Sequence, residues 1–299
     1  MYPATIDSAF LATYFGTRTA ARYEAVTDLP IGNRSVTIKS LGVRQNLDFE
    51  LAFGPQWAAG VSLLGQFLTG VTGESLATQG AIYGYGATVN GAVRIARIDS
   101  SATQIAFRLA AFGVQGGGRV TVGPLLRALR NTTISNVPDI LGNFGSLLVT
   151  PVSWFGVGAS IDVAQALGPV VSLQGSFRLD LHRFTASPFV PGQGRVDQSS
   201  TEWLPQAGVA LGVNPEGWPV AFLGEYRITS QDSSDPTSPA THLAALGGYY
   251  DARTDLQLGA VILGEFGFPA LQGIDANGNP VGSDRGEATS AEIVMRYIW

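Results

Sequence analysis

Acidic, histidine and serine side chains on one short segment raise the question of acid–base catalysis. Ser172, Ser176, Asp180 and His182 all lie at even positions, so a β-strand would present the four side chains on one face. Residues two apart on a strand are separated by about 6.6 Å, however, and a nucleophile must lie within hydrogen-bonding reach of its base. The spacing argues against a Ser–His–Asp triad here, and we expect no catalytic residue and no enzyme activity.

Other reactive groups are scarce. The chain has no cysteine and only two histidines, His182 and His242, which excludes disulfides and cysteine-ligated zinc and argues against a histidine-rich metal site. The sequence contains no Gly-x-Ser-x-Gly, phosphate-loop or His-Glu-x-x-His motif. We therefore expect no cofactor and no metal.

The composition is that of a membrane protein or an all-β protein. Charged residues make up 14% of the 299 residues, against about 25% in typical soluble domains, and 38 residues are glycine. The 18 basic and 23 acidic residues give a net charge of −5, which argues against nucleic-acid binding. Three charge-free stretches, 51–73, 75–93 and 140–161, have the length of spanning helices, but they lack a continuous apolar body. We expect no transmembrane helix.

Apolar and polar residues instead alternate along the chain, as in strands that face lipid on one side and a lumen on the other. Glu292 and Arg296 lie on the polar face of the last such segment. Its apolar face consists of Ile293, Met295, Tyr297 and Trp299. The same alternation occurs within 41–53, 104–113, 170–184, 219–229 and 256–266, and more weakly within 57–67, 82–97, 153–164, 203–213 and 241–250. A soluble β-sandwich with this pattern would bury its charges, so we reject that alternative.

Short and long connections follow one another between these segments. The short ones are 54–56, 98–100, 166–169, 214–217 and 251–255, and the long ones are 68–81, 114–152, 185–202, 230–240 and 267–287. Outer-membrane barrels have short periplasmic turns and long extracellular loops, and their strand number is even. A first strand is therefore expected within 18–29. The sequence predicts one all-β domain, 1–299, that forms a closed antiparallel transmembrane β-barrel of about 12 strands, within a range of about 10 to 14.

The C-terminal pattern Ile293-x-Met295-x-Tyr297-x-Trp299 resembles the assembly signal of bacterial outer-membrane β-barrel proteins. In that family an aromatic residue ends the chain, another lies two positions earlier and apolar residues alternate upstream. Phenylalanine is commoner than tryptophan at the last position. The alternating pattern covers about residues 41–299, and Gly42–Leu51 is similar to strands of small-molecule outer-membrane transporters.

This resemblance implies several properties of the protein. It implies a porin-like location in the outer membrane of a Gram-negative bacterium, surrounded by lipid and lipopolysaccharide. It also implies that the barrel-assembly machinery recognises the C-terminal strand. The opening residues contain no signal peptide, which we expect to have been removed before this numbering begins. Aromatic side chains should concentrate at the two membrane interfaces. We expect this of Trp57, Tyr83, Trp154, Trp203, Tyr226, Tyr249 and Tyr297.

The polar face of the strands should line the lumen. The candidate lining residues are Arg44, Asp48, Glu50, Arg94, Arg108, Asp162, Arg178, Asp180, His182, Glu225, Arg227, Glu265, Glu292 and Arg296. Acids and bases nearly balance, whereas a strongly selective pore would carry rings of one sign. The charges could pack a narrow interior as ion pairs, or form a polar lining that passes or binds solute, and both can hold in one barrel.

Two segments outside the strands have helical patterns. In the 114–152 loop, short helices are expected within 122–130 and 138–144, and Gly116–Gly118 would allow a sharp reversal at its start. The loop would either gate the mouth or form a cap. The gate residues would be Leu125, Leu126, Leu129, Ile140 and Phe144. Residues 1–17 would form a helix or plug, entering the barrel from below or binding a periplasmic or envelope-complex partner.

The combined pattern favours passage over catalysis. We expect an outer-membrane channel or transporter for passive movement of small molecules through a narrow, charge-balanced lumen. Two alternatives remain open at this point, which are a structural scaffold barrel in an envelope-spanning complex and a lipid-modifying enzyme.

Overall fold

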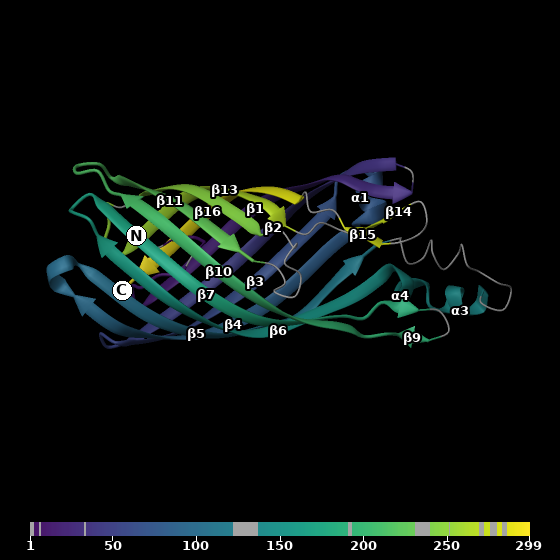
Figure 1. Cartoon of the computed structure of the whole chain (residues 1–299), viewed down its shortest axis with the longest axis horizontal. Coiled ribbons are helices and arrows are strands. Elements are labelled where there is room, and N and C mark those ends of the chain that lie inside the picture. The colour runs from purple at the N-terminus through teal and green to yellow at the C-terminus, as the bar shows by residue number, and fades with distance from the viewer. Residues whose placement is uncertain are drawn as a thin grey trace.

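The computed structural model describes residues 3–5, 7–32, 34–121, 137–190, 193–230, 240–250, 252–268, 272–275, 280–282 and 286–299. Its strands form an elongated closed barrel (Figure 1). The barrel strands are β1 (Tyr14–Gly32), β2 (Arg34–Phe53), β3 (Trp57–Gly70), β4 (Ala81–Ile98), β5 (Thr103–Val120), β6 (Val149–Ala166), β7 (Val171–Ala186), β10 (Gln198–Val213), β11 (Val220–Thr229), β12 (Thr241–Tyr250), β13 (Leu256–Phe268) and β16 (Gly286–Ile298).

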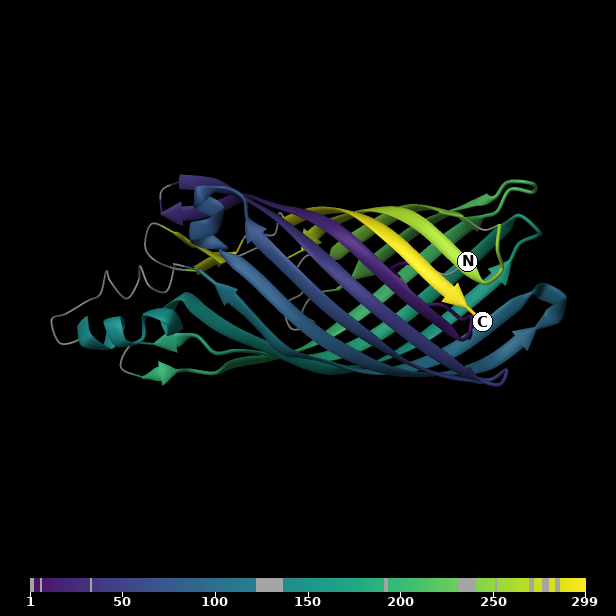
Figure 2. The same ribbon diagram turned by 180° about the vertical axis from the view of Figure 1, so that it is seen from behind.

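Each barrel strand pairs antiparallel with its neighbours, and the first strand closes the barrel. β1 pairs with β2 along one edge and with β16 along the other, from Tyr14–Ile298 to Val26–Gly286. Figure 2 shows β16 beside β1 on the rear of the barrel. The prediction of a closed antiparallel barrel of 12 strands is confirmed. The first strand is longer than the predicted 18–29 at both ends, because β1 is already paired with β2 and β16 at Tyr14 and stays paired with β2 as far as Ile31–Arg34.

The two ends of the barrel differ. The end that carries both termini has the short turns, including the 3₁₀ helix η1 (Asp99–Ser101) (Figure 1). The other end carries α1 (Gly73–Thr78), α3 (Val137–Gly142), α4 (Phe144–Leu148), the hairpin of β8 (Phe189–Val190) and β9 (Gly194–Arg195), and the strands β14 (Gln272–Asp275) and β15 (Pro280–Gly282). β1 and β2 also meet at that end, where they are paired as far as Ile31–Arg34 without a long loop between them, which is an exception to the predicted rule. Among the described helices, none has the length and apolar character needed to cross a membrane.

Side chains alternate between the outer surface and the interior, as the period of two predicts. On β2, Leu41 and Val43 are 52% and 59% exposed, whereas Asp48 and Glu50 are 6% and 2% exposed. Ile293, Met295 and Tyr297 of β16 face outward, Arg296 faces inward, and Trp299, which directly follows β16, is also exposed. In a membrane, this outer apolar surface would contact lipid, which is the arrangement of transmembrane barrels.

Two of the aromatic residues expected at the membrane interfaces lie inside the barrel, so that part of the prediction is wrong. Tyr249 is 1% exposed and packs in an interior apolar cluster with Leu223 and Val261. Trp154 lines the luminal cavity. Its position is even, like that of the buried Asp162 on the same strand, so strand parity sends it inward.

The three glycines after β5's midpoint do not reverse the chain. Gly116 and Gly118 lie within β5, which continues to Val120, and a side chain at either position would clash with the ring of Tyr85 or Tyr83 on β4. Their lack of a Cβ allows these rings to cross the neighbouring strand. The expected reversal is therefore corrected to a close approach of tyrosine rings to the backbone.

The two expected helical regions have different outcomes. Helices α3 and α4 occupy 137–148, near the predicted 138–144, while the predicted helix at 122–130 lies outside the described residues. The expected N-terminal helix is absent from the described residues 3–5 and 7–13, which are irregular, and β1 already begins at Tyr14. The reason is that this stretch satisfies its backbone groups against the barrel wall.

Candidate functional site

The candidate site is the lumen together with the described residues 3–5 and 7–13, called the N-terminal segment below. Strand parity turns the predicted lining residues inward. The barrel brings arginines from six different strands to one interior cavity. They are Arg18, Arg44, Arg108, Arg178, Arg227 and Arg296. The more deeply buried predicted members are Asp48, Glu50, Arg108, Asp162, Asp180, Glu225 and Arg296. The half-buried ones are Arg94, Arg178, His182, Arg227, Glu265 and Glu292, and Arg44 is exposed to the cavity.

Ion pairs join part of the wall into a fixed network. The guanidinium of Arg108 lies 2.6 Å from a carboxylate oxygen of Glu50, and both side chains are almost fully buried. Arg178 Nε donates to Asp180 at 2.8 Å along the same strand. Asp162, at 1% exposure, instead accepts hydrogen bonds from serine hydroxyls, including one of 2.7 Å from Ser176. These pairs place opposite charges in contact, which offsets the cost of burying them.

The N-terminal segment binds inside this network. Glu225 on β11 accepts hydrogen bonds from the backbone N–H groups of Ala4 and Thr5, at 2.8 and 2.7 Å, and from the Thr5 hydroxyl at 2.6 Å. Arg227, two residues further on the same face, donates to the carbonyl oxygen of Thr5 at 2.9 Å. Arg18 on β1 donates to the carbonyl oxygen of Ala4 at 2.6 Å. Wall side chains therefore replace the backbone pairing that a helix or strand would give this stretch.

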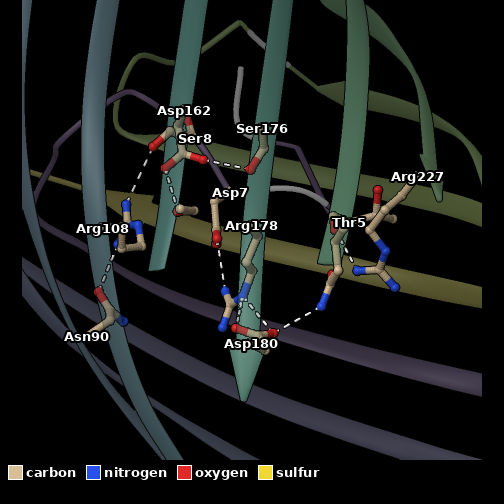
Figure 3. A network of polar contacts seen from close by, with 12 residues as sticks. Thr5, Asp7, Ser8, Asn90, Arg108, Asp162, Ser176, Arg178, Asp180 and Arg227 are labelled. Carbon is tan, nitrogen blue, oxygen red and sulfur yellow. Dashed lines mark hydrogen bonds and ion pairs between the residues drawn. The ribbon is translucent and has the colours of Figure 1, made fainter. Parts of the chain in front are cut away.

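An acidic side chain of the segment completes an ion-pair chain with the wall. Asp7 lies 2.9 Å from Arg178 Nη1, and Arg178 in turn contacts Asp180 (Figure 3). Burial raises the pKa of the Asp7 carboxyl, but the charges of Arg178 and Arg108 outweigh that effect and hold the pKa below its usual range. Asp7 therefore stays ionised at neutral pH and paired with the wall.

The segment also has an apolar anchor. Ala9 is 1% exposed and packs in a cluster with Ala106 of β5 and Ala164 of β6, against which Phe10 also packs. Ser8 donates to Gln174 of β7 at 3.2 Å. The segment thus contacts strands on several sides of the barrel and crosses the lumen rather than lying along one wall.

Space remains beside the segment. One cavity of about 400 Å³ is lined by Ala4, Asp7 and Ser8 and by wall residues that include Arg44 and Glu50. A second, of about 190 Å³, lies between Thr5, Asp7 and the side chains of Arg178, Asp180 and Arg227. Both exceed the volume of a single water molecule, and polar side chains dominate their linings. The lumen therefore keeps polar cavities large enough for water beside the segment, while another part of the interior is filled by the apolar cluster around Tyr249.

The two histidines are placed differently, and neither lies in a triad. His182 stacks on Trp154, with ring centroids 5.4 Å apart, and its Nε2 is 3.8 Å from Asp180. No hydrogen bond joins it to a serine among the residues that the structure describes. His242 hydrogen bonds to the outward-facing Tyr226 at 2.6 Å. No cluster of possible metal ligands occurs within the described part of the chain.

The gate residues that can be placed lie away from the lumen. Ile140 of α3 is buried against Leu147 of α4, and Phe189 of the β8–β9 hairpin packs on the same cluster. Phe144 of α4 is 49% exposed. Both helices project beyond the barrel end (Figure 1). The described part of the loop is thus a projection from the barrel end, which is the cap of the two arrangements expected for it, and the gate role of these residues stays a prediction. Leu125, Leu126 and Leu129 lie outside the described residues.

Sequence reasoning missed the residues that hold the segment. Arg18 and Arg22 on β1 both face the lumen. Arg18 donates to the carbonyl oxygen of Ala4, and Arg22 forms an ion pair with Glu265 at 2.9 Å. The alternation of Arg18, Ala20, Arg22 and Glu24 was visible, but the opposite face contains Thr17, Thr19 and Ala21 and is only weakly apolar. The role of Thr5 and Asp7 could not be found from spacing, because their partners are up to 222 residues away.

No protein-family model matches the sequence, and no curated protein matches it either. Three solved structures share the fold at low sequence identity. The translocator domain of the autotransporter NalP from Neisseria meningitidis has a TM-score of 0.53 and 10% identity, covering 97% of this chain and 89% of that one. The β domain of the Bordetella autotransporter BrkA has a TM-score of 0.55 and 13% identity, with coverages of 96% and 100%. An outer membrane channel from Pseudomonas putida F1 has a TM-score of 0.55 and 8% identity, and each chain is covered completely. The chain therefore has the fold of the outer-membrane β-barrel proteins.

Proposed function

We propose that the protein is an outer-membrane channel for small polar solutes and that the N-terminal segment closes it in the conformation described. One observation carries the proposal. The described contacts of residues 4–8 with the wall are made through wall side chains, and none of them is part of the barrel's strand pairing. The segment can therefore leave the lumen without breaking the barrel, and the polar wall it leaves behind would suit hydrated solutes.

The balance of charge in the wall supports passage of polar rather than strongly ionic solutes. Arginine and carboxylate side chains alternate in contact, as in Arg108–Glu50 and Arg178–Asp180. Such a lining offers donors and acceptors to a solute but no ring of one sign. We place the barrel in the bacterial outer membrane, in contact with lipid and lipopolysaccharide, and propose that the barrel-assembly machinery recognises its last strand.

Deletion of residues 2–12 tests this function. Full-length protein should conduct poorly in planar bilayers and release small sugars slowly from liposomes, whereas the deletion variant should form stable pores and release them rapidly. A variant lacking α3 and α4, residues 137–148, is the matched control, and its conductance should equal that of the full chain because both helices project away from the lumen. An assembled deletion variant that conducts no more than the full chain would contradict the proposal.

A second candidate is a scaffold barrel of an envelope-spanning complex. The observation in its favour is that the segment and the wall ion pairs occupy the lumen while α3, α4 and the β8–β9 hairpin extend beyond it as a projecting surface. The scaffold and the channel predict different results for the deletion of residues 2–12. A scaffold would retain low conductance after the deletion, and proteins that co-purify with the full chain would be lost when the projection is removed.

A further inference from the structure

The wall recognises the N-terminal segment mainly through its backbone. Glu225 accepts from two consecutive backbone N–H groups, and Arg18 and Arg227 donate to the carbonyl oxygens of the same two residues, Ala4 and Thr5. Wall donors and acceptors of this kind fit the backbone of any peptide, because every residue except proline presents one N–H and one C=O. These contacts do not depend on which side chains the segment carries.

Glu225 and Arg227 are committed to this role. The hydrogen bonds that Glu225 accepts from the described residues all come from the segment, although its side chain is 5% exposed. Arg227 makes no ion pair with a carboxylate in the described part of the chain, and the hydrogen bond it donates there goes to Thr5. A buried carboxylate without hydrogen-bond donors is unfavourable. Glu225 and Arg227 are therefore suited to bind the N–H and C=O groups of a peptide backbone.

A third wall residue adds a side-chain preference. Arg178 is held by Asp180 at 2.8 Å and directs Nη1 to Asp7 at 2.9 Å. Figure 3 shows Asp7 pointing to Arg178, with Thr5 near Arg227. The acidic residue follows the second clamped amide by two positions, and its carboxylate reaches Arg178 on β7 while the clamped amides bind Glu225 on β11. Because Asp180 fixes the guanidinium whether or not Asp7 is present, this subsite is preformed.

We propose that the lumen is a binding site for short peptides with an acidic side chain two residues after the amides clamped by Glu225, and that the N-terminal segment is its internal competitor. The inference rests on the proposed function, since such a peptide would be the solute that the channel admits. The cavity of about 400 Å³ beside the segment gives an incoming peptide room to enter before the segment has left.

The test uses the full chain with the segment disabled and the wall intact. Thr5→Pro removes an N–H that donates to Glu225, and Asp7→Arg opposes Arg178, so together they release the segment. A fluorescent, acetylated peptide with the sequence of residues 3–12 is then added to this undocked variant in detergent, and its anisotropy is followed. The matched control peptide exchanges the aspartate and the serine at positions 7 and 8, which keeps composition and charge.

The outcomes separate the inference from the proposed function. We expect saturable binding of the first peptide, at least tenfold weaker binding of the exchanged peptide, and at least tenfold weaker binding when Glu225→Gln is added. Adding Glu216→Gln, in an exposed turn outside the lumen, should leave binding unchanged. Absence of binding, or equal binding of the two peptides, overturns the inference. Conductance of the same undocked variant tests the channel independently, because a pore that opens but binds neither peptide contradicts only the peptide site.

Discussion

Removing the negative charge of Glu225 should release the N-terminal segment. The carboxylate accepts three hydrogen bonds of 2.6 to 2.8 Å from Ala4 and Thr5. In Glu225→Gln, one oxygen becomes an amide NH₂ group, so at least one of these bonds is lost and a donor faces a donor. Hydrogen bonds to charged groups contribute about 1.5–3 kcal/mol each, and the bonds that remain lose their charge assistance. A loss of about 3 kcal/mol follows, which corresponds to a roughly 100-fold larger undocked population.

Thiol labelling measures that population directly. The chain contains no cysteine, so Ser8→Cys introduces a unique thiol at a position that is 8% exposed when the segment is docked. A maleimide reacts only after the segment leaves, and its rate follows the undocked fraction when docking is fast. We expect labelling to accelerate by one to two orders of magnitude (about 10- to 100-fold) when Glu225→Gln is added. The Glu216→Gln control should label like the parent, and an acceleration below about threefold in Glu225→Gln would refute the assigned role of the carboxylate.

Three further predictions concern the wall, the lipid-facing surface and pH. Arg108→Gln leaves the buried Glu50 unpaired and should lower the unfolding free energy by about 3–5 kcal/mol. Arg97 pairs with Asp99 on the exposed surface, so Arg97→Gln should change thermal unfolding little, and equal effects of the two variants would contradict the buried network. Leu179→Arg, on the outer face of β7, should lower the unfolding free energy in lipid by up to about 2–4 kcal/mol, and Leu167→Arg, in a turn, should lower it less. Similar denaturant midpoints for the two variants would disprove the outward direction of Leu179. Because the pKa of Asp7 is lowered, its ion pair with Arg178 is present above the usual aspartate range and is lost only as pH falls through that lowered value. The Ser8→Cys labelling rate, divided at each pH by the rate of the same thiol in the undocked Thr5→Pro, Asp7→Arg variant, should therefore stay low from pH 8 to about 5. A rise of this ratio near pH 6 would show that a group other than Asp7 controls docking.

The strands could be predicted from sequence because lipid and lumen impose opposite chemistry on alternate residues. Leu41 and Val43 opposite Asp48 and Glu50 leave little freedom of register. β1 was harder to bound, since its outward face includes Thr19 and is only weakly apolar. Trp154 is an exception to the rule that places tryptophan at membrane interfaces, because it lines the lumen. The parity of its position on the strand alone predicts that inward direction.

The candidate site could be predicted only in part. The inward direction of Arg178 and Glu225 follows from periodicity, but their joint contact with Asp7 and Thr5 requires the closed barrel. The apolar spacing of Phe10 and Tyr14 suggested a helix, yet a helix would leave the buried wall groups around Glu225 without donors. Satisfaction of those groups outweighs helix propensity in so short a segment.

A reversible tether on the N-terminal segment tests the central claim that this segment closes a conduit. Ala9 packs in one cluster with Ala106 and Ala164, so Ala9→Cys combined with Ala106→Cys or Ala164→Cys offers two placements for a disulfide in a chain without other cysteines. In the Glu225→Gln background, a single inserted molecule should remain closed while oxidised and should open to a stable conducting level when reductant is added. A channel whose conductance is the same before and after the disulfide is reduced would contradict the account.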